Sequence, residues 1–210
     1  MPSNTWILTH TGGRVELEHP HWDDIFLTDI AHHLARIGRY TGAGDMYISV
    51  AQHSVHVSCI CPPSLAREGL LHDAAEAYLT DVSTPLKRLL RGVDDLPEGW
   101  RTVLEGALDA QTLAALREAL PGYRELERRF QAVIAERFDI ALTPPGLKIY
   151  DVRSALAERR DNGPYGCPDE DWLGMPAGTA PSPHPEVVYP WLPEQAEAEF
   201  LARAEELGIS

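Results

Sequence analysis

The chain has 210 residues, 44% of them hydrophobic and 24% charged, which is the composition of one globular domain (residues 1–210) with a single sizeable core. Its formal net charge of −14 argues against a nucleic-acid polymer as partner, because such proteins usually present a basic face to phosphates; a small anionic substrate would need a metal ion or a few local cations to hold it. There is no leader pattern, no apolar run approaches the roughly 18 residues of a membrane span, and the 3 cysteines lack paired spacing, so we expect a cytoplasmic protein with reduced thiols and no membrane segment.

The first half of the chain predicts a small hairpin followed by helices. In chain order these are strands at 6–9 and 15–17 and helices at 28–39, 49–60, 64–81 and 85–91. Gly12 and Gly13 supply the hairpin turn, and we expect this hairpin to be the only sheet. Thr28 and Ser64 are placed to cap the first and third helices. In the helix at 49–60, His53 shares the inward face with valines at helical spacing.

The second half predicts further helices and one irregular stretch. The helices lie near 100–119, 123–138, 143–160 and 194–207. Residues 161–193 hold eight prolines, which disfavours regular structure and predicts an irregular strap across the surface. The predicted fold class is therefore all-α, a helical bundle with its core at about 25–160, a small N-terminal hairpin, and a final helix that docks after the strap.

The residues that indicate chemistry begin with His72, Asp73 and Glu76. On a helix, side chains three and four positions apart share a face, so an imidazole and two carboxylates project together from apolar surroundings. Neutral imidazole with carboxylate suits a divalent transition metal, and the adjacent His72 and Asp73 can bind one ion. His53 and Asp151 face the core from two other helices and complete a set of two histidines and two aspartates.

Neighbouring residues offer alternatives to this set. Asp139, at the end of a helix, and Asp161, beside the strap, compete with Asp151 for the fourth ligand position. Three more histidines lie on helices near the predicted site and are expected to be satisfied or partly exposed rather than ligands: His32, His33 and His56.

The order His53, His72-Asp73, Asp151 resembles the H…HD…D pattern of HD-domain metal-dependent phosphohydrolases. The run His72-Asp73-x-x-Glu76-x-x-x-x-Asp81-x-x-Thr84-Pro85-x-Lys87 resembles the small bacterial 5'-deoxynucleotidase branch and the related phage dATP triphosphohydrolases. The resemblance covers about residues 25–160 and implies an HD-domain fold, a homo-oligomer, and a divalent ion (Zn, Mn, Co, Fe or Mg). His184 is the one histidine after His72, so the extra downstream histidines of dinuclear relatives are missing and a single ion is favoured.

The resemblance also assigns roles beyond the metal ligands. It implies that Glu76 and Asp81 act on the catalytic water or on the leaving group. The implied substrate contacts are Arg39, Tyr40, Lys87 and Pro85. Tyr40 stands where the family has tryptophan.

The activity that the resemblance implies is hydrolysis of 2'-deoxyribonucleoside 5'-monophosphates, small-molecule nucleotides, to nucleoside and phosphate. One alternative is a deoxynucleoside triphosphate triphosphohydrolase, which releases intact triphosphate at the same centre. Another is a non-catalytic, ligand-sensing HD module. The presence of all four ligands and of Glu76 and Asp81 argues against that module, because it would tolerate losing one of them.

Overall fold

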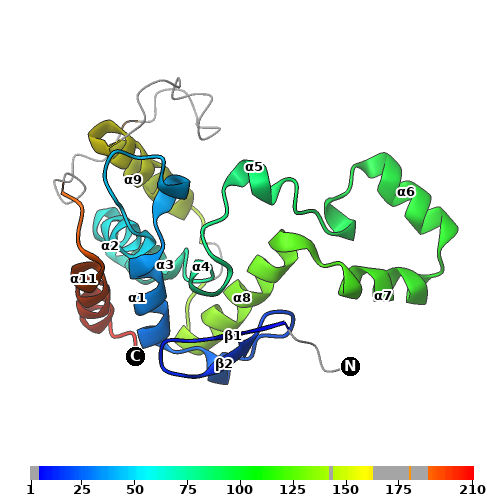
Figure 1. Ribbon diagram of the computed structural model, residues 1–210, viewed down its shortest axis with the longest axis horizontal. Coiled ribbons are helices and arrows are strands. Elements are labelled where there is room, and N and C mark those ends of the chain that lie inside the picture. Colours follow the sequence, from blue (N-terminus) through cyan, green and yellow to red (C-terminus); the bar gives the residue numbers. More distant parts are fainter. Residues whose placement is uncertain (1–4, 142–143, 163–179, 181–188) are drawn as a thin grey trace.

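The computed structural model describes residues 5–141, 144–162, 180 and 189–210. Its elements are β1 (Trp6–Leu8), β2 (Arg14–Glu16), η1 (Trp22–Asp24), α1 (Leu27–Arg36), η2 (Arg39–Gly42), α2 (Val50–Ile60), η3 (Pro63–Leu65), α3 (Ala66–Leu71), α4 (Glu76–Leu79), α5 (Thr84–Lys87), η4 (Val93–Asp95), α6 (Glu98–Ala107), α7 (Ala110–Ala119), α8 (Gly122–Phe138), α9 (Leu147–Asn162) and α11 (Pro193–Glu206). The predicted all-α fold with one N-terminal hairpin is confirmed (Figure 1). The predicted strap at 161–193 lies largely outside the described residues.

The hairpin is fastened to the first helix. Strands β1 and β2 are antiparallel with Ile7 opposite Val15, and the buried Val15 fixes which face meets the core. At the tip, Thr11 donates from its amide and its hydroxyl to Asp29 at 2.8 and 2.9 Å. Asp29 is fully buried and holds the hairpin in place.

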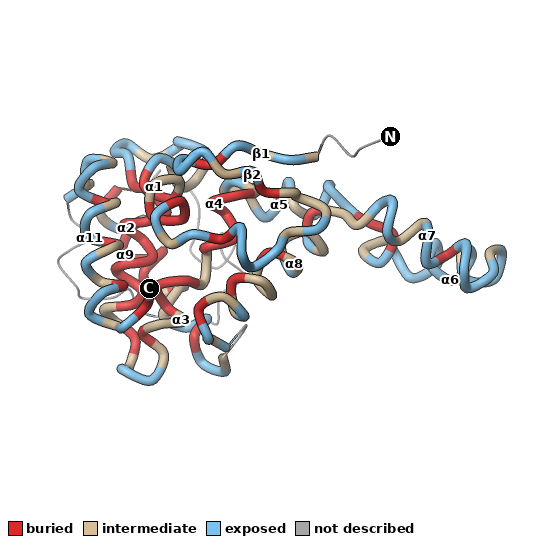
Figure 2. The backbone as a smooth tube through the Cα atoms, turned by 90° about the horizontal axis from the view of Figure 1, so that it is seen from below, coloured by how far each residue is buried: buried red, intermediate tan, exposed pale blue. Residues whose placement is uncertain are grey.

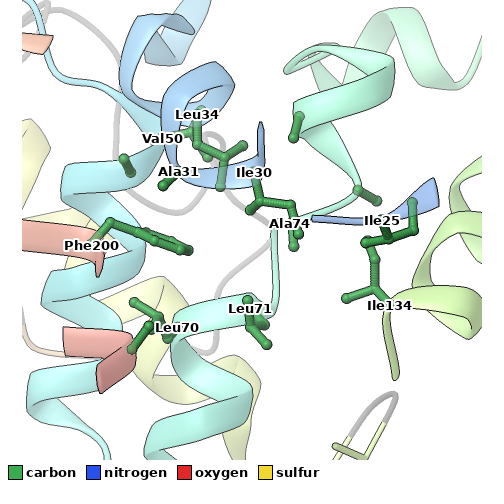
Figure 3. Close-up of a cluster of buried hydrophobic side chains, with 14 of the residues drawn as sticks. Ile25, Ile30, Ala31, Leu34, Val50, Leu70, Leu71, Ala74, Ile134 and Phe200 are labelled. Atoms are coloured by element: carbon green, nitrogen blue, oxygen red, sulfur yellow. The ribbon is translucent and has the colours of Figure 1, made fainter. Parts of the chain in front are cut away.

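The core lies where α1, α2, α3 and α11 pack together. Figure 3 shows Phe200 reaching from α11 toward Val50 of α2 and Leu70 of α3, and all three side chains are completely buried. Burial of this kind is the main stabilising contribution to a helical domain. The predicted docking of the final helix is therefore confirmed, and Ala196 and Ala204 of the same helix are also fully buried.

Helices α6 and α7 form an arm that projects from this bundle (Figures 1 and 2). Their residues are mostly exposed, and Leu113 is the one buried side chain within them. The single helix predicted at 100–119 is wrong, because Asp109 caps a new helix by accepting the amide of Thr112 at 2.8 Å. In the described part of the chain, none of the helices has both the length and the apolar character needed to span a bilayer.

Two predicted helix caps are also wrong. Helix α1 starts at Leu27, one residue before Thr28, and its N-cap Phe26 makes no side-chain capping bond. Ser64 lies inside the short turn η3, and α3 starts after it at Ala66. By contrast Ser49 caps α2, accepting the amide of Gln52 at 3.1 Å, so the helix that carries His53 begins where the sequence predicts.

Candidate metal centre

Three segments bring the four predicted ligands together. His53 lies within α2 and is 1% exposed, His72 and Asp73 follow α3, and Asp151 lies in α9. One ligand atom from each of His53, His72 and Asp151 lies within 4.8 Å of the others. The Asp73 Oδ2 atom stands between the two rings, 3.1 Å from His72 Nε2 and 3.7 Å from His53 Nε2. The Asp151 Oδ1 atom is 3.2 Å from His53 Nε2.

A break in the helix positions His72 and Asp73. The continuous helix predicted at 64–81 is wrong here, because α3 ends at Leu71 and α4 starts at Glu76. Between them the amides of Ala74 and Glu76 bond to carbonyls three residues back, at 3.0 and 2.9 Å. This tighter turn carries His72 and Asp73 between the two helices, and their side chains bring His72 Nε2 and Asp73 Oδ2 to 3.1 Å from each other.

Each histidine is held by the ring nitrogen that faces away from the cluster. His53 Nδ1 lies 2.6 Å from Glu158 Oε1, and His72 Nδ1 lies 2.9 Å from the Gly69 carbonyl oxygen. Because a carboxylate and a carbonyl accept, both Nδ1 atoms carry a proton, and in the neutral rings that bind a metal both Nε2 atoms turn a lone pair toward the cluster. Both Nε2 atoms are buried without a hydrogen-bond partner among the described residues. A metal ion would satisfy them, so this donor set fits one.

The charges of the cluster keep its carboxylates ionised. Burial alone would raise the pKa of Asp73 and of Asp151, but the adjacent His72 and His53 rings hold both well below the usual range. Burial and Arg39 would lower the pKa of His53, but Glu158 and Asp151 outweigh them and raise it to about 9, so a metal ion would have to displace a proton from its Nε2 atom. Ionised carboxylates are the form that binds a metal.

The aspartates that compete with Asp151 for the fourth ligand position, and the histidines expected not to bind a metal, lie outside the cluster. Asp139 is the left-handed C-cap of α8, with φ at 49°, and Asp161 pairs with Arg160 at 2.6 Å. Neither belongs to the cluster of ligand atoms, which takes Asp151. His33 Nδ1 meets the Ala77 carbonyl oxygen at 2.7 Å and His56 Nδ1 meets Ser154 Oγ at 2.7 Å, as expected of histidines that are not ligands.

Glu158 is a site residue to which the sequence assigned no role. It is 1% exposed and accepts from His53 Nδ1 at 2.6 Å and from Arg39 Nε at 2.8 Å, and the Tyr40 hydroxyl also donates to it. Burial would raise the pKa of Glu158, but Arg39 and His53 lower it to about 2. The one signal in the sequence is that Glu158 shares the inward face of its helix with Asp151.

Hydrogen bonds to the Glu158 carboxylate hold Arg39 and Tyr40 at the site. The Arg39 Nη1 atom lies 3.6 Å from Asp73 Oδ2, so the guanidinium bridges Glu158 and a predicted metal ligand. Tyr40 and Thr41 adopt left-handed backbone conformations, with φ of 57° and 54°. Two consecutive non-glycine residues in that region are strained, and such strain is typical of functional sites.

A cavity of 440 Å³ opens beside the cluster. Its lining brings together both aspartates predicted as metal ligands, both predicted acid-base residues and all four predicted substrate contacts: Asp73, Asp151, Glu76, Asp81, Arg39, Tyr40, Pro85 and Lys87. These residues come from segments far apart in the chain, and the cavity has the size of a small-ligand site.

Within this cavity burial raises the pKa of both predicted acid-base residues, Glu76 and Asp81. Burial, followed by the charges of Asp73 and Asp81, raises the pKa of Glu76 well above its usual value, and burial is the main cause of the raised pKa of Asp81. Glu76 Oε2 is buried with no hydrogen-bond partner in the described residues. Lys87 Nζ lies 3.8 Å from Glu76 Oε1 and 2.7 Å from Glu127 Oε1, and Glu127 is a further contact that sequence reasoning missed.

Replacing Glu158 with glutamine is expected to weaken metal binding at this centre by about 10- to 100-fold, the usual effect of losing a ligand's orienting carboxylate. Glutamine keeps an oxygen that accepts from His53 Nδ1 but removes the negative charge that makes the ring a better donor. Competition of the purified protein with a chromogenic chelator for Zn²⁺ measures the effect. Tyr40→Phe is the control, because it removes one donor to Glu158 and keeps the carboxylate. Equal affinities of Glu158→Gln and the wild type would contradict the prediction.

Comparison with known proteins identifies relatives over most of the chain. The Escherichia coli (strain K12) protein named "Uncharacterized protein YfdR" is 30% identical over 206 residues, 97% of this chain and 96% of its own length. An uncharacterized protein of Rhodobacter capsulatus is 32% identical over 186 residues, which are 73% of this chain and 93% of that protein. No protein-family model matches.

Proposed function

This chain belongs to the family of YfdR, and we propose that it is a metal-dependent phosphohydrolase that acts on nucleotides. The observation that carries the proposal is the convergence of two buried, unpartnered imidazole Nε2 atoms with two carboxylates beside a 440 Å³ cavity. That cavity also holds two further carboxylates, from Glu76 and Asp81, and three cations, from Arg39, Lys87 and Lys148. These are the parts that phosphate-ester hydrolysis needs.

The central cluster would hold one divalent ion, Zn²⁺, Mn²⁺, Co²⁺, Fe²⁺ or Mg²⁺, through His53, His72, Asp73 and Asp151. When bound, such an ion lowers the pKa of water and offsets negative charge on the phosphate. Protein side chains supply the remaining steps. Asp81 and Glu76 transfer protons to and from the attacking water and the leaving oxygen, and the raised pKa of each supports that role.

The substrates proposed are 2'-deoxyribonucleoside 5'-monophosphates, cleaved to nucleoside and phosphate. Incubation of the protein with a panel of nucleoside mono- and triphosphates, in each of several divalent metals, tests this directly. A phosphate assay detects monophosphate cleavage, and anion chromatography detects intact triphosphate, the product of the alternative triphosphohydrolase. Absence of turnover with every pair, together with nucleotide binding, would instead identify a ligand-sensing module.

The proposal also covers the location of the protein in the cell, its partner and its oligomeric state. The three cysteines without paired spacing support a cytoplasmic location, and the acidic composition supports a small-molecule partner over a nucleic-acid polymer. Exposed apolar side chains on and near the arm support a homo-oligomer, since Leu89, Trp100 and Val103 are 75%, 65% and 58% exposed. Sedimentation velocity measures that association.

Arg39→Ala is expected to lower kcat/KM by about 10- to 150-fold, because a charge-assisted hydrogen bond is worth about 1.5–3 kcal/mol. Arg39 lines the cavity of an acidic chain in which few cations are available to hold a phosphate. Arg39→Lys is expected to recover only part of the loss, because lysine lacks the planar pair of donors. Steady-state kinetics with one good substrate, at confirmed full metal content, measures all variants.

Arg128→Ala is the matched control for this series. Arg128 pairs with Glu125 on the outer face of α8 and is largely exposed, so kcat/KM should stay at the wild-type value. If Arg39→Ala and Arg128→Ala gave the same kcat/KM, Arg39 would not bind substrate.

A further inference from the structure

A second group of metal-binding side chains lies where the hairpin tip, α1 and α11 meet. His10 is in the turn between β1 and β2, His32 is in α1 and Glu197 is in α11. One ligand atom from each lies within 4.8 Å of the others. Helices α1 and α11 lie side by side (Figure 1), which brings His32 opposite Glu197. The central cluster contributes none of these residues.

The distances in this group are close to those that one ion requires. His32 Nδ1 is 3.1 Å from Glu197 Oε2, and the His10 ring stacks on the His32 ring with centroids 3.5 Å apart and planes 8° apart. Ligands bound at about 2.0–2.2 Å to a tetrahedral ion stand roughly 3.3–3.5 Å from each other. His10 is exposed, so a tilt of its ring is enough to direct a nitrogen to the point that the other two share.

His32 gives independent support for a ligand at this point. Its Nδ1 atom is buried and forms no hydrogen bond within the described residues, because the approach of Glu197 does not have the direction of one. A buried polar atom without a partner is costly, and a metal ion would remove that cost.

The backbone that carries His10 is held in place before any ion binds. The His10 amide donates to His33 Nε2 at 3.1 Å, so the His33 proton lies on Nδ1, which donates to the Ala77 carbonyl oxygen at 2.7 Å. On the other side of the tip, Thr11 is bonded twice to the buried Asp29. Binding therefore has to order one side chain and not a whole loop, which lowers its entropic cost.

Arg36 orients the carboxylate of the group. Its Nη1 atom donates to Glu197 Oε2 at 2.7 Å, in the way that outer hydrogen bonds orient metal ligands. The positive charge of Arg36 also reduces the attraction for a cation, which leaves the two imidazoles as the main source of affinity.

We propose that His10, His32 and Glu197 form a second metal site that binds a transition-metal ion such as Zn²⁺, Co²⁺ or Ni²⁺. Two imidazoles and one carboxylate leave a coordination position open. Both histidines also line a cavity of 520 Å³, together with His33 and Arg36 among others. The bound ion links the hairpin, α1 and α11. This site does not depend on the proposed phosphohydrolase activity.

Metal counting on four tag-free, full-length proteins tests the site: wild type, His10→Ala, His72→Ala and the double variant. Each is stripped with a chelator, dialysed against Zn²⁺ and analysed for metal per chain. We expect two ions in the wild type, one in each single variant and none in the double variant. His19→Ala is the control, because His19 is also exposed and approaches a carboxylate, Glu118, at 3.6 Å, and it should retain two ions.

Thermal unfolding gives a second measurement. Zn²⁺ should raise the Tm of His72→Ala and leave that of the double variant unchanged, since only a bound ion stabilises the fold. Equal metal content in His10→Ala and the wild type would overturn the second site. One ion in the wild type and in His72→Ala, with none in His10→Ala, would support this site and overturn the central one, so the two failures are distinguishable.

Discussion

Asp73→Ala is expected to lose the ion of the central site and the phosphohydrolase activity together. Asp73 Oδ2 lies within 3.7 Å of both His53 Nε2 and His72 Nε2, so its removal takes away the oxygen that both rings share. Metal affinity should fall by more than about 100-fold, because even an outer-shell partner of a ligand contributes 10- to 100-fold. The fold should persist, because Asp73 is not part of the apolar core. Elemental analysis and initial rates on the same samples measure both losses.

Asp94→Ala is the matched control for this experiment. It also removes one carboxylate, but from an exposed pair with Arg117 near the arm, and should leave metal and activity unchanged. A full complement of metal in the Asp73→Ala protein, with activity lost, would mean that Asp73 acts on the substrate and does not bind the ion. Full metal and full activity would contradict its place at the centre altogether.

The sequence predicted the central cluster because few side chains bind metals and helical spacing shows which of them face inward. His53 and Asp151 were assigned to the core side of their helices, and both lie there. The role of Glu158 was not identified. It shares the inward face of its helix with Asp151, but it also precedes Arg159 and Arg160, which is the usual pattern of a solvated helix end. Its role depends on His53 and Arg39, each more than a hundred residues away in the chain.

The two helix breaks that the sequence analysis did not predict have different causes. The break between α6 and α7 had a local signal, since Asp109 is a preferred N-cap residue with Thr112 three positions later. The break between α3 and α4 had none, because no glycine or proline lies between Leu70 and Leu79. There the chain tightens to place His72 and Asp73 at the centre, and tertiary structure overrides local helix propensity.

Glu76→Gln is expected to keep the central ion and lose turnover by roughly two to four orders of magnitude, the usual contribution of a general acid or base. Glu76 lines the cavity and its Oε2 atom is buried without a hydrogen-bond partner in the described residues, so it can receive or give a proton to a bound molecule. Glutamine has the same shape but cannot titrate. Stopped assays of phosphate release, with metal analysis of the same samples, measure the effect on kcat.

Glu127→Gln separates this role from an effect on Lys87. Lys87 Nζ lies 2.7 Å from Glu127 Oε1 and 3.8 Å from Glu76 Oε1, so either change removes a carboxylate from the same ammonium. Only Glu76 lines the cavity, and therefore only its replacement should abolish turnover. Comparable losses of kcat in both variants would show that Glu76 acts by holding Lys87. Wild-type turnover in Glu76→Gln would remove Glu76 from the reaction.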